Sequence, residues 1–335
     1  MHAEAASAPA VVRAQILRNA TTAELLGKEL RALAPRAAVT CARGSSDHAA
    51  TFAKYLIETR LGILTASAAP SIASVYGARQ DLRDCVFIAM SQSGRSPDLL
   101  ETTRSALEAG AYVVALVNDE DSPLAGMASR VLPLSAGPET SVAATKSYLA
   151  SLSALLHLVA AWSDEQDLLD ALRSAPDLMA RAWNLDWSPA LPLLETAPNL
   201  FVIARGVGLA VAQEAALKCK ETCGLHAESF SGAEVRHGPQ ALLGHDFPAL
   251  VLAQDDESRP GLEALARELV ERGVQVAAAG VEVPGAIALP TLAAHPAVAP
   301  LMLAQSFYRL ANAVAIARGM DPDSPPHLQK VTRTH

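Results

Sequence analysis

Short hydrophobic runs alternate with helical patterns along most of this 335-residue chain. The first run, residues 37–42, ends at a Gly-Ser-Ser turn and precedes a segment whose apolar residues recur at helical spacing. The same order of strand, polar turn and helix returns at the run 85–90. Two more runs, 112–117 and 130–134, lead to a helical pattern over about residues 143–162. Continuous apolar strands that alternate with helices predict a parallel sheet covered on both faces.

The second half of the chain repeats this architecture, with weak sequence identity between the halves. Its hydrophobic runs cover residues 199–206, 247–254, 274–280 and 286–290, and a helical pattern follows over about residues 297–319. Ser, Asp and Pro clusters fill the stretch between the two copies and indicate a domain boundary. We therefore expect an α/β fold with two flavodoxin-like, doubly wound domains in tandem.

This pattern divides the chain into five segments, and its length suits two domains of ordinary size. An N-terminal helical segment covers residues 1–29, and the first sheet domain covers residues 30–165. Connecting helices over residues 166–195 lead to the second sheet domain, residues 196–320. A Pro-rich tail, residues 321–335, completes the chain.

Composition narrows the class of partner. Half of the residues are hydrophobic, 19% are charged, and the net charge is −8 with acids and bases interspersed. This balance is typical of a globular enzyme and does not create the basic surface that nucleic acids require, so we expect no nucleic-acid partner. The sequence shows neither a cationic segment followed by a long apolar stretch at its start nor an apolar run of about 18 residues, so we expect a cytoplasmic protein without membrane contact.

The four cysteines, Cys41, Cys85, Cys219 and Cys223, lie in or beside apolar segments and form no CxxC pair. We interpret them as reduced core thiols, with metal ligation or disulfides as the alternative. We expect no metal site and no cofactor.

Two polar turns in the first half are suited to binding an anion. Gly44, Ser45 and Ser46 follow the first strand, and residues 91–96 follow the next one. In a parallel sheet such turns meet at one edge, where glycine lets the backbone approach a ligand and helix N-termini favour a phosphate. The alternative is that these residues only cap helices. Neither turn has the P-loop pattern and GxGxxG is absent, so ATP and NAD are not predicted.

Charged residues that could transfer protons gather between residues 214 and 239. Helical spacing places Glu214, Lys218 and Glu221 on one face, where they could also form ordinary ion pairs. His226 with Glu228, and a His237 held before Gly-Pro, follow within the same stretch. Such a cluster could serve acid–base chemistry at a carbonyl, although a single histidine is often structural.

Four segments resemble, in order and spacing, the isomerase half of glutamine:fructose-6-phosphate amidotransferase (glucosamine-6-phosphate synthase), which is built from two sugar isomerase (SIS) domains. The resemblance covers about residue 30 to the C-terminus, and the chain is also similar to stand-alone double-SIS glucosamine-6-phosphate deaminases. The segments are SQSGRSPDLLE (91–101), AGPETSVAATKS (136–147), EAALKCKETCGLHAESFSGAEVRHGP (214–239) and DPDSPPHLQKVT (321–332).

The resemblance implies a substrate-binding set in the first half. It assigns the 6-phosphate to hydroxyl and backbone donors of the two polar turns and the sugar to residues beside them. The candidate binding residues are Arg43, Gly44, Ser45, Ser46, Ser91, Gln92, Ser93, Ser96, Val142 and Ala144. Arg43 stands where the synthases have Cys, Arg95 where they often have an acidic residue, and Ala144 where they have Ser, so the sugar pocket differs from theirs.

The resemblance also implies the catalytic residues. Glu221 matches the carboxylate that moves a proton between C1 and C2, and Lys218 matches a lysine that stabilises the developing enolate. His237 matches a histidine proposed for ring opening that reaches in from a neighbouring subunit, which implies a homodimer with a shared active site. Lys330 matches the lysine that engages the ketose carbonyl.

The reaction follows as an expectation from the resemblance. The synthases take ammonia from an N-terminal glutaminase domain, whereas about 30 residues precede the first predicted strand here. We therefore expect conversion of glucosamine 6-phosphate to fructose 6-phosphate and ammonia without glutamine. One alternative is a deglycase acting on a fructosamine 6-phosphate. The other is a sugar-phosphate sensor without catalysis, which would not need Glu221, His237 and Lys330 together.

Overall fold

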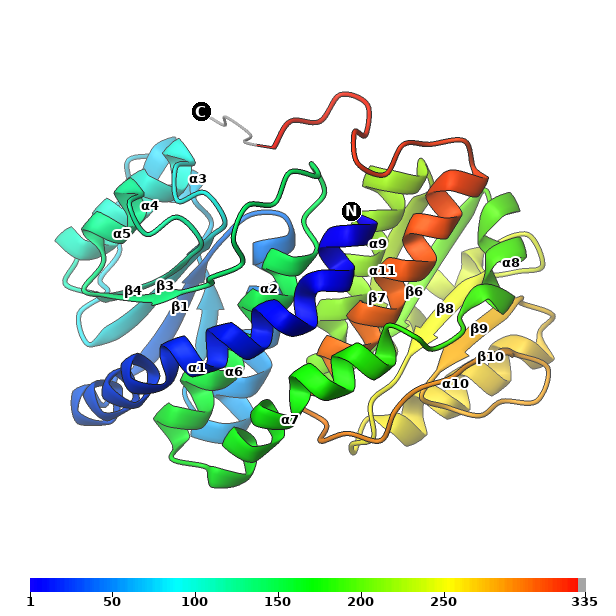
Figure 1. The fold of residues 1–335 in the computed structure, drawn as a ribbon, viewed down its shortest axis with the longest axis horizontal. Coiled ribbons are helices and arrows are strands. Elements are labelled where there is room, and N and C mark those ends of the chain that lie inside the picture. The colour runs from blue at the N-terminus through cyan, green and yellow to red at the C-terminus, as the bar shows by residue number, and fades with distance from the viewer. Residues whose placement is uncertain (331–335) are drawn as a thin grey trace. The chain divides into compact units, whose positions relative to one another are not determined.

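The computed structural model describes residues 1–330 and separates into two compact units. Unit A comprises residues 10–139, 146–173 and the tail from Gln329, and unit B comprises residues 1–9, 140–145 and 174–328. Each unit contains a five-stranded parallel sheet, which confirms the predicted α/β fold with two tandem sheet domains (Figure 1). The predicted tail is described as far as Lys330, and residues 331–335 lie outside the described residues.

Unit A holds the first sheet, in the order β2-β1-β3-β4-β5. Its strands are β1 (Ala37–Cys41), β2 (Thr65–Ser67), β3 (Cys85–Ser91), β4 (Tyr112–Val117) and β5 (Arg130–Pro133). Its helices are α2 (Ser45–Leu61), α3 (Ser71–Ser74), α4 (Pro97–Glu108), α5 (Pro123–Met127) and α6 (Lys146–Ser163). Two further helices, α1 (His2–Leu33) and α7 (Gln166–Ala182), contribute residues to both units.

The first sheet is covered on both faces because its strands are continuous hydrophobic runs. β3 is buried at every position. Alternate residues of neighbouring strands, such as Phe87 and Val113, form a core with Leu99 of α4 and Leu124 of α5. The intervening residues point to the other face, where α2 covers the sheet and packs against α6.

Unit B holds the second sheet, in the order β10-β9-β8-β6-β7. Its strands are β6 (Asn199–Ala204), β7 (His226–Ser231), β8 (Ala249–Leu252), β9 (Val276–Ala279) and β10 (Ile287–Leu289). Its α-helices are α8 (Leu191–Thr196), α9 (Leu209–Cys223), α10 (Arg259–Glu271) and α11 (Ala299–Ala317). Its 3-10 turns are η1 (Ser188–Ala190), η2 (Gly206–Gly208), η3 (Glu234–His237) and η4 (Pro239–Leu242).

The second sheet is packed in the same way as the first. Phe201 and Val251 form a core with Leu262 and Leu265 of α10 on one face. On the other face α9 lies on β6 and β7 and packs against α11 (Figure 1).

The two sheets have one topology. Counted within its own unit, each sheet has its strands in the order 2-1-3-4-5, which is the doubly wound order of flavodoxin-like domains. Ligands of such sheets bind beyond the carboxyl ends of the strands, where the order reverses. This edge lies between β1 and β3 in unit A and between β6 and β8 in unit B.

One strand in each sheet was absent from the hydrophobic pattern. β2 has only three residues, and β7 is a polar edge strand on which His226 and Glu228 are exposed. The hydrophobic run that identifies a strand buried on both faces does not occur in such strands. The prediction of four strands in each half was therefore one strand short.

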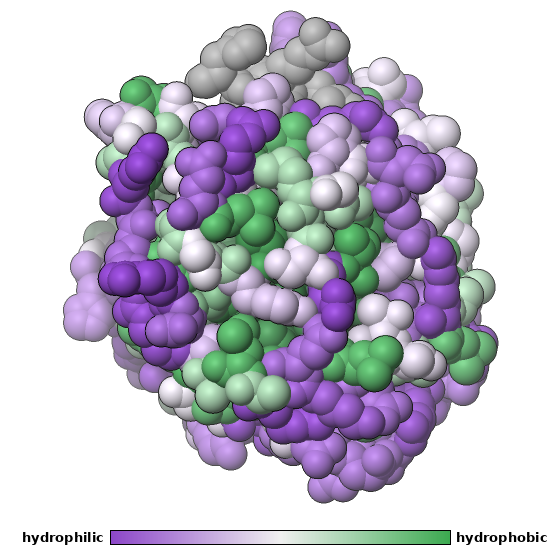
Figure 2. All heavy atoms as spheres, turned by 90° about the vertical axis from the view of Figure 1, so that its left-hand side faces the viewer, coloured by the Kyte–Doolittle hydropathy of each residue, from purple (hydrophilic) through white to green (hydrophobic). Residues whose placement is uncertain are grey.

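The surface is mainly hydrophilic on the face that Figure 2 presents, with smaller hydrophobic areas between the polar ones. Hydrophobic atoms make up much of any protein surface, so these areas need no special partner. Among residues 1–330, no helix combines the length and the apolarity that a membrane-spanning helix requires.

Candidate active site

The two polar turns of the first half lie at one edge of the first sheet. β1 and β3 are neighbours, with Cys41 in register with Ala89, so the segments that follow them emerge together. Gly44 precedes α2 with a φ of 55°, a conformation that glycine adopts easily. Ser45 and Ser46 open α2 and are partly exposed. Their hydroxyls can donate to an anion, and the dipole at the N-terminus of α2 favours one there.

The turn after β3 is held by its own side chains. The backbone N–H of Gly94 donates to the buried Ser91 Oγ at 2.9 Å. Gly94 has a φ of 62°, and a side chain there would collide with Ser122 Oγ. Gln92 and Ser93 stay partly exposed, and Ser96 precedes α4. The turn therefore keeps a fixed shape while it presents hydroxyl, amide and backbone donors.

Arg43 adds a positive charge to this edge. Its Nε and Nη2 donate to Asp98 Oδ2 at 3.0 and 2.8 Å. Asp98 lies in the first turn of α4 with a side chain only 4% exposed, whereas the Arg43 side chain is 54% exposed. The contact ties the end of β1 to the start of α4 and holds the guanidinium beside both turns. Arg95 instead pairs with Asp119 at 2.7 Å.

Lys330 has a partner in unit A that the sequence did not indicate. Its Nζ lies 3.0 Å from Glu139 Oε2, and the Glu139 side chain is fully buried. Ser147 donates to the same carboxylate, from Oγ to Oε2 at 2.6 Å and from N to Oε1 at 3.2 Å. Glu139 thus fixes Lys330. It lies in the segment 136–147 quoted above, yet only the tertiary contact distinguishes it from an ordinary residue before a helix.

The charged face of α9 in unit B forms a buried group. Lys218 is fully buried, and its Nζ contacts Glu221 Oε2 and lies 3.5 Å from Glu214 Oε1. Tyr308 of α11 donates to the same Glu214 oxygen at 3.0 Å. Burial by itself lowers the pKa of Lys218, but the two carboxylates outweigh it and raise this pKa above its ordinary value. Glu221 is 23% exposed and can reach a substrate.

The remaining candidates lie apart from these contacts. His237 ends η3 as an exposed side chain, and Gly238 follows with a φ of 140°. Among residues 1–330, the His237 side chain has no hydrogen-bond partner. Val142 and Ala144 are partly exposed residues of unit B, and the Val142 N–H donates to the Asp323 carbonyl at 3.3 Å.

His226 and Glu228 do not join the proton-transfer group. They lie on the edge strand β7, and His226 Nδ1 pairs with Asn199 Oδ1 at 3.0 Å. Their closeness to Glu221 in sequence therefore carried no information about the site. No three His, Cys, Asp or Glu side chains gather as a metal site among residues 1–330.

The equivalent edge of unit B is filled by its own side chains. After β8, Gln254 Nε2 donates to the carbonyl of Arg205, which follows β6, and to Asp256 Oδ2 at 2.7 Å. Asp256 Oδ1 accepts the backbone N–H of Ser258 at 2.9 Å. A carboxylate of unit B itself thus accepts hydrogen bonds at this edge.

Comparisons with known proteins identify the family of this chain. The SIS domain family matches residues 34–161 and 193–280. The glutamine–fructose-6-phosphate aminotransferase (isomerizing) of Aeropyrum pernix is 34% identical over 310 residues, which cover 86% of this chain and 49% of that protein. The chain therefore spans about half the length of the curated relatives it matches.

Solved structures extend the comparison to the whole fold. A crystal structure from Silicibacter pomeroyi, assigned provisionally as a phosphosugar isomerase, is 42% identical with a TM-score of 0.91 and covers 96% of this chain and 99% of that one. The glucosamine-6-phosphate deaminase of Thermotoga maritima shares the fold at 21% identity, with a TM-score of 0.74 over 97% of this chain and 100% of that one. This chain belongs to the SIS domain family and carries two such domains.

Proposed function

We propose that this protein is a phosphosugar enzyme that moves a proton between C1 and C2 of a hexosamine or hexose 6-phosphate. Its main reaction in this proposal converts glucosamine 6-phosphate to fructose 6-phosphate and ammonia. The observation that carries the proposal is the carboxylate of Glu221, partly exposed and held by the buried Lys218. A protein that only binds sugar phosphates would not need Glu221, His237 and Lys330 together.

The phosphate is assigned to the turns of unit A. Hydroxyls of Ser45, Ser46, Ser93 and Ser96 and the N-termini of α2 and α4 supply neutral donors. Arg43 supplies the positive charge, because its guanidinium is held at this edge by Asp98 and remains half exposed. Hydrogen bonds in which one partner is charged are the stronger kind, and a phosphate can accept several of them.

The chemistry is assigned to acid–base groups of this chain. His237 assists opening of the sugar ring, and Glu221 takes the proton from C2 and returns it to C1. The Lys218 ammonium stabilises the negative charge that develops between these steps. The product is the C2 ketimine of fructose 6-phosphate, and water converts its C=N bond to C=O with release of ammonia. Lys330, oriented by Glu139, engages the ketose oxygen.

Similarity supports the same assignment. A relative whose name describes an isomerizing reaction on fructose 6-phosphate matches 86% of the chain. Proton transfer between C1 and C2 is common to isomerisation and deamination, so one set of residues serves both.

Substrate turnover tests the proposal. The protein is incubated with glucosamine 6-phosphate, and free ammonia and fructose 6-phosphate are measured; we expect both in equal amounts. Binding of the sugar phosphate without any release would contradict an enzymatic role. Cleavage of a fructosamine 6-phosphate in place of glucosamine 6-phosphate would show that the amine substrate is a different one.

A further inference from the structure

A cavity of about 520 Å³ lies in unit B at the carboxyl ends of β8, β9 and β10. Gln254, which donates to Asp256 at the edge between β6 and β8, also borders this cavity. Carboxyl ends of parallel strands are where doubly wound sheets bind ligands, and about 300–1,000 Å³ is the usual size of a small-molecule site. No residue assigned to the phosphosugar reaction lines this cavity.

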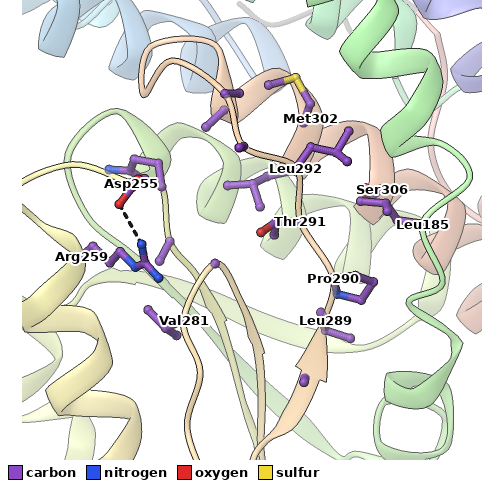
Figure 3. A pocket seen from close by; sticks show the side chains of 18 of the residues that line it. Leu185, Asp255, Arg259, Val281, Leu289, Pro290, Thr291, Leu292, Met302 and Ser306 are labelled. Carbon is purple, nitrogen blue, oxygen red and sulfur yellow. Dashed lines mark hydrogen bonds and ion pairs between the residues drawn. The ribbon is translucent and has the colours of Figure 1, made fainter.

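The cavity has one polar and one apolar wall. On one side Asp255 and Arg259 form an ion pair at 2.7 Å (Figure 3). Across from them lie Thr291 and Leu292, on the segment that follows β10 (Figure 3). Met302 of α11 also borders the space. A ligand here meets charged groups and hydrocarbon surface together.

The segment after β10 offers unused backbone groups. Trp187 Nε1 donates to the Pro290 carbonyl at 2.9 Å and fixes the start of this segment. Among residues 1–330, the backbone groups of residues 291–294 have no hydrogen-bond partner. Thr291 and Ala293 are exposed, so water can satisfy the backbone groups of this stretch and a ligand can replace that water.

Charge selects the kind of ligand. Asp255 and Glu282 line the cavity, and its one lining cation, Arg259, is already paired with Asp255. Asp256 and Glu257 follow directly in the sequence. The excess of carboxylates disfavours a phosphate and favours a cation. The turns of unit A, with serines and Arg43, have the opposite preference.

We propose that this cavity binds a small, cationic, polyhydroxylated molecule of the amino-sugar class that carries no phosphate. Its ammonium group faces the carboxylate of Glu282. Its hydroxyls exchange hydrogen bonds with the Thr291 hydroxyl and the backbone of residues 291–294. Its C–H surface lies on Leu292 and Met302. This site is separate from the proposed reaction and does not depend on it.

Binding of glucosamine to the full chain, measured by calorimetry, tests the inference. We expect glucosamine to bind and N-acetylglucosamine, which lacks the charge, to bind at least about tenfold more weakly, the effect of losing one charge-assisted hydrogen bond. Glu282→Gln should weaken glucosamine binding by a similar factor. The control Asp246→Asn changes an exposed carboxylate outside the cavity and should leave binding unchanged.

A second pair of variants separates this cavity from the phosphosugar site. Leu292→Trp fills the cavity and should abolish glucosamine binding, while thermal unfolding shows whether the variant is folded. Ser46→Ala in unit A should leave glucosamine binding intact. Absence of binding to the wild type, equal binding of N-acetylglucosamine, or unchanged binding in Glu282→Gln and Leu292→Trp would each overturn the proposal.

Discussion

At the scale of residues, Lys218 shows how a charged side chain is stabilised in a buried environment between helices. It is fully buried, and its ammonium depends on carboxylates one turn away on the same helix. Removing one partner of a buried ion pair leaves the other charge without compensation. The loss of stability is then larger than the stability that the intact pair contributes. Glu214, 1% exposed, would be the charge left buried.

Lys218→Met should therefore destabilise the protein by about 3–5 kcal/mol. Its neighbour Lys220 is exposed on the same helix, so Lys220→Met is a matched control expected to change the free energy of unfolding by less than about 0.5 kcal/mol. Chemical denaturation of both variants measures the difference. Equal stabilities would show that the charge of Lys218 is not held by the two glutamates.

His157, a buried residue of α6, predicts a dependence of stability on pH. Burial, with a smaller contribution from Arg173, lowers its pKa from 6.5 to about 4. Below pH 6.5 the unfolded chain takes up the proton first, so folding stability falls between pH 6.5 and about 4. Between pH 7 and 4.5 this loss is about 2–3 kcal/mol for the wild type.

The variant His157→Gln removes the contribution of this histidine to the pH dependence of stability, whereas the contribution of the acidic residues remains. We expect its free energy of unfolding to fall less than that of the wild type over the same pH range. Parallel pH dependence in the two proteins would place His157 in a solvated environment and contradict its burial.

At the scale of elements, the hydrophobic pattern located the strands that are buried on both faces and the helices between them. β3 and β4, for example, lie almost where their apolar runs predicted them. β2 and β7 could not be found in this way, since one is three residues long and the other is a polar edge strand. The positions of Ser45 and Ser91 at one edge followed from parallel topology, whereas Glu139 and the cavity beyond β10 depend on tertiary packing that no local pattern encodes.

The geometry of the turn after β3 requires a glycine at position 94, which a substitution can test. Gly94→Ala introduces a side chain at a positive φ and against Ser122, so we expect a loss of stability above about 1 kcal/mol and a higher KM for the phosphosugar. Gly126→Ala in α5 is the control, because its φ is not positive and its side chain would enter open space. Thermal unfolding and steady-state kinetics of both variants measure these effects. An unchanged KM in a folded Gly94→Ala protein would show that this turn is not part of the substrate site.

At the scale of the whole molecule, the two units have one sheet topology and opposite chemistry at their strand ends. Unit A presents serines and Arg43, and unit B presents carboxylates around its cavity. Such a division is consistent with one anionic and one cationic ligand. His237, exposed and without a partner among residues 1–330, fits the expectation that it acts in a neighbouring subunit.

Mixing inactive variants tests that expectation. Glu221→Gln and His237→Ala are each expected to be inactive, but a mixed dimer with shared sites contains one site in which both residues are intact. An equimolar mixture after subunit exchange should recover about a quarter of wild-type activity, since half of the dimers are mixed and one of their two sites is complete. No recovery, although native mass spectrometry shows mixed dimers, would place both residues in a site of one chain.

The rate of ammonia release from glucosamine 6-phosphate by Glu221→Gln tests the central claim most directly. Loss of the carboxylate base should lower kcat by about 10²–10⁴-fold and leave binding of the sugar phosphate nearly intact. Glu228→Gln, a control on the exposed edge strand β7, should retain wild-type kcat. Equal kcat for Glu221→Gln and the wild type would contradict the assignment of proton transfer to Glu221.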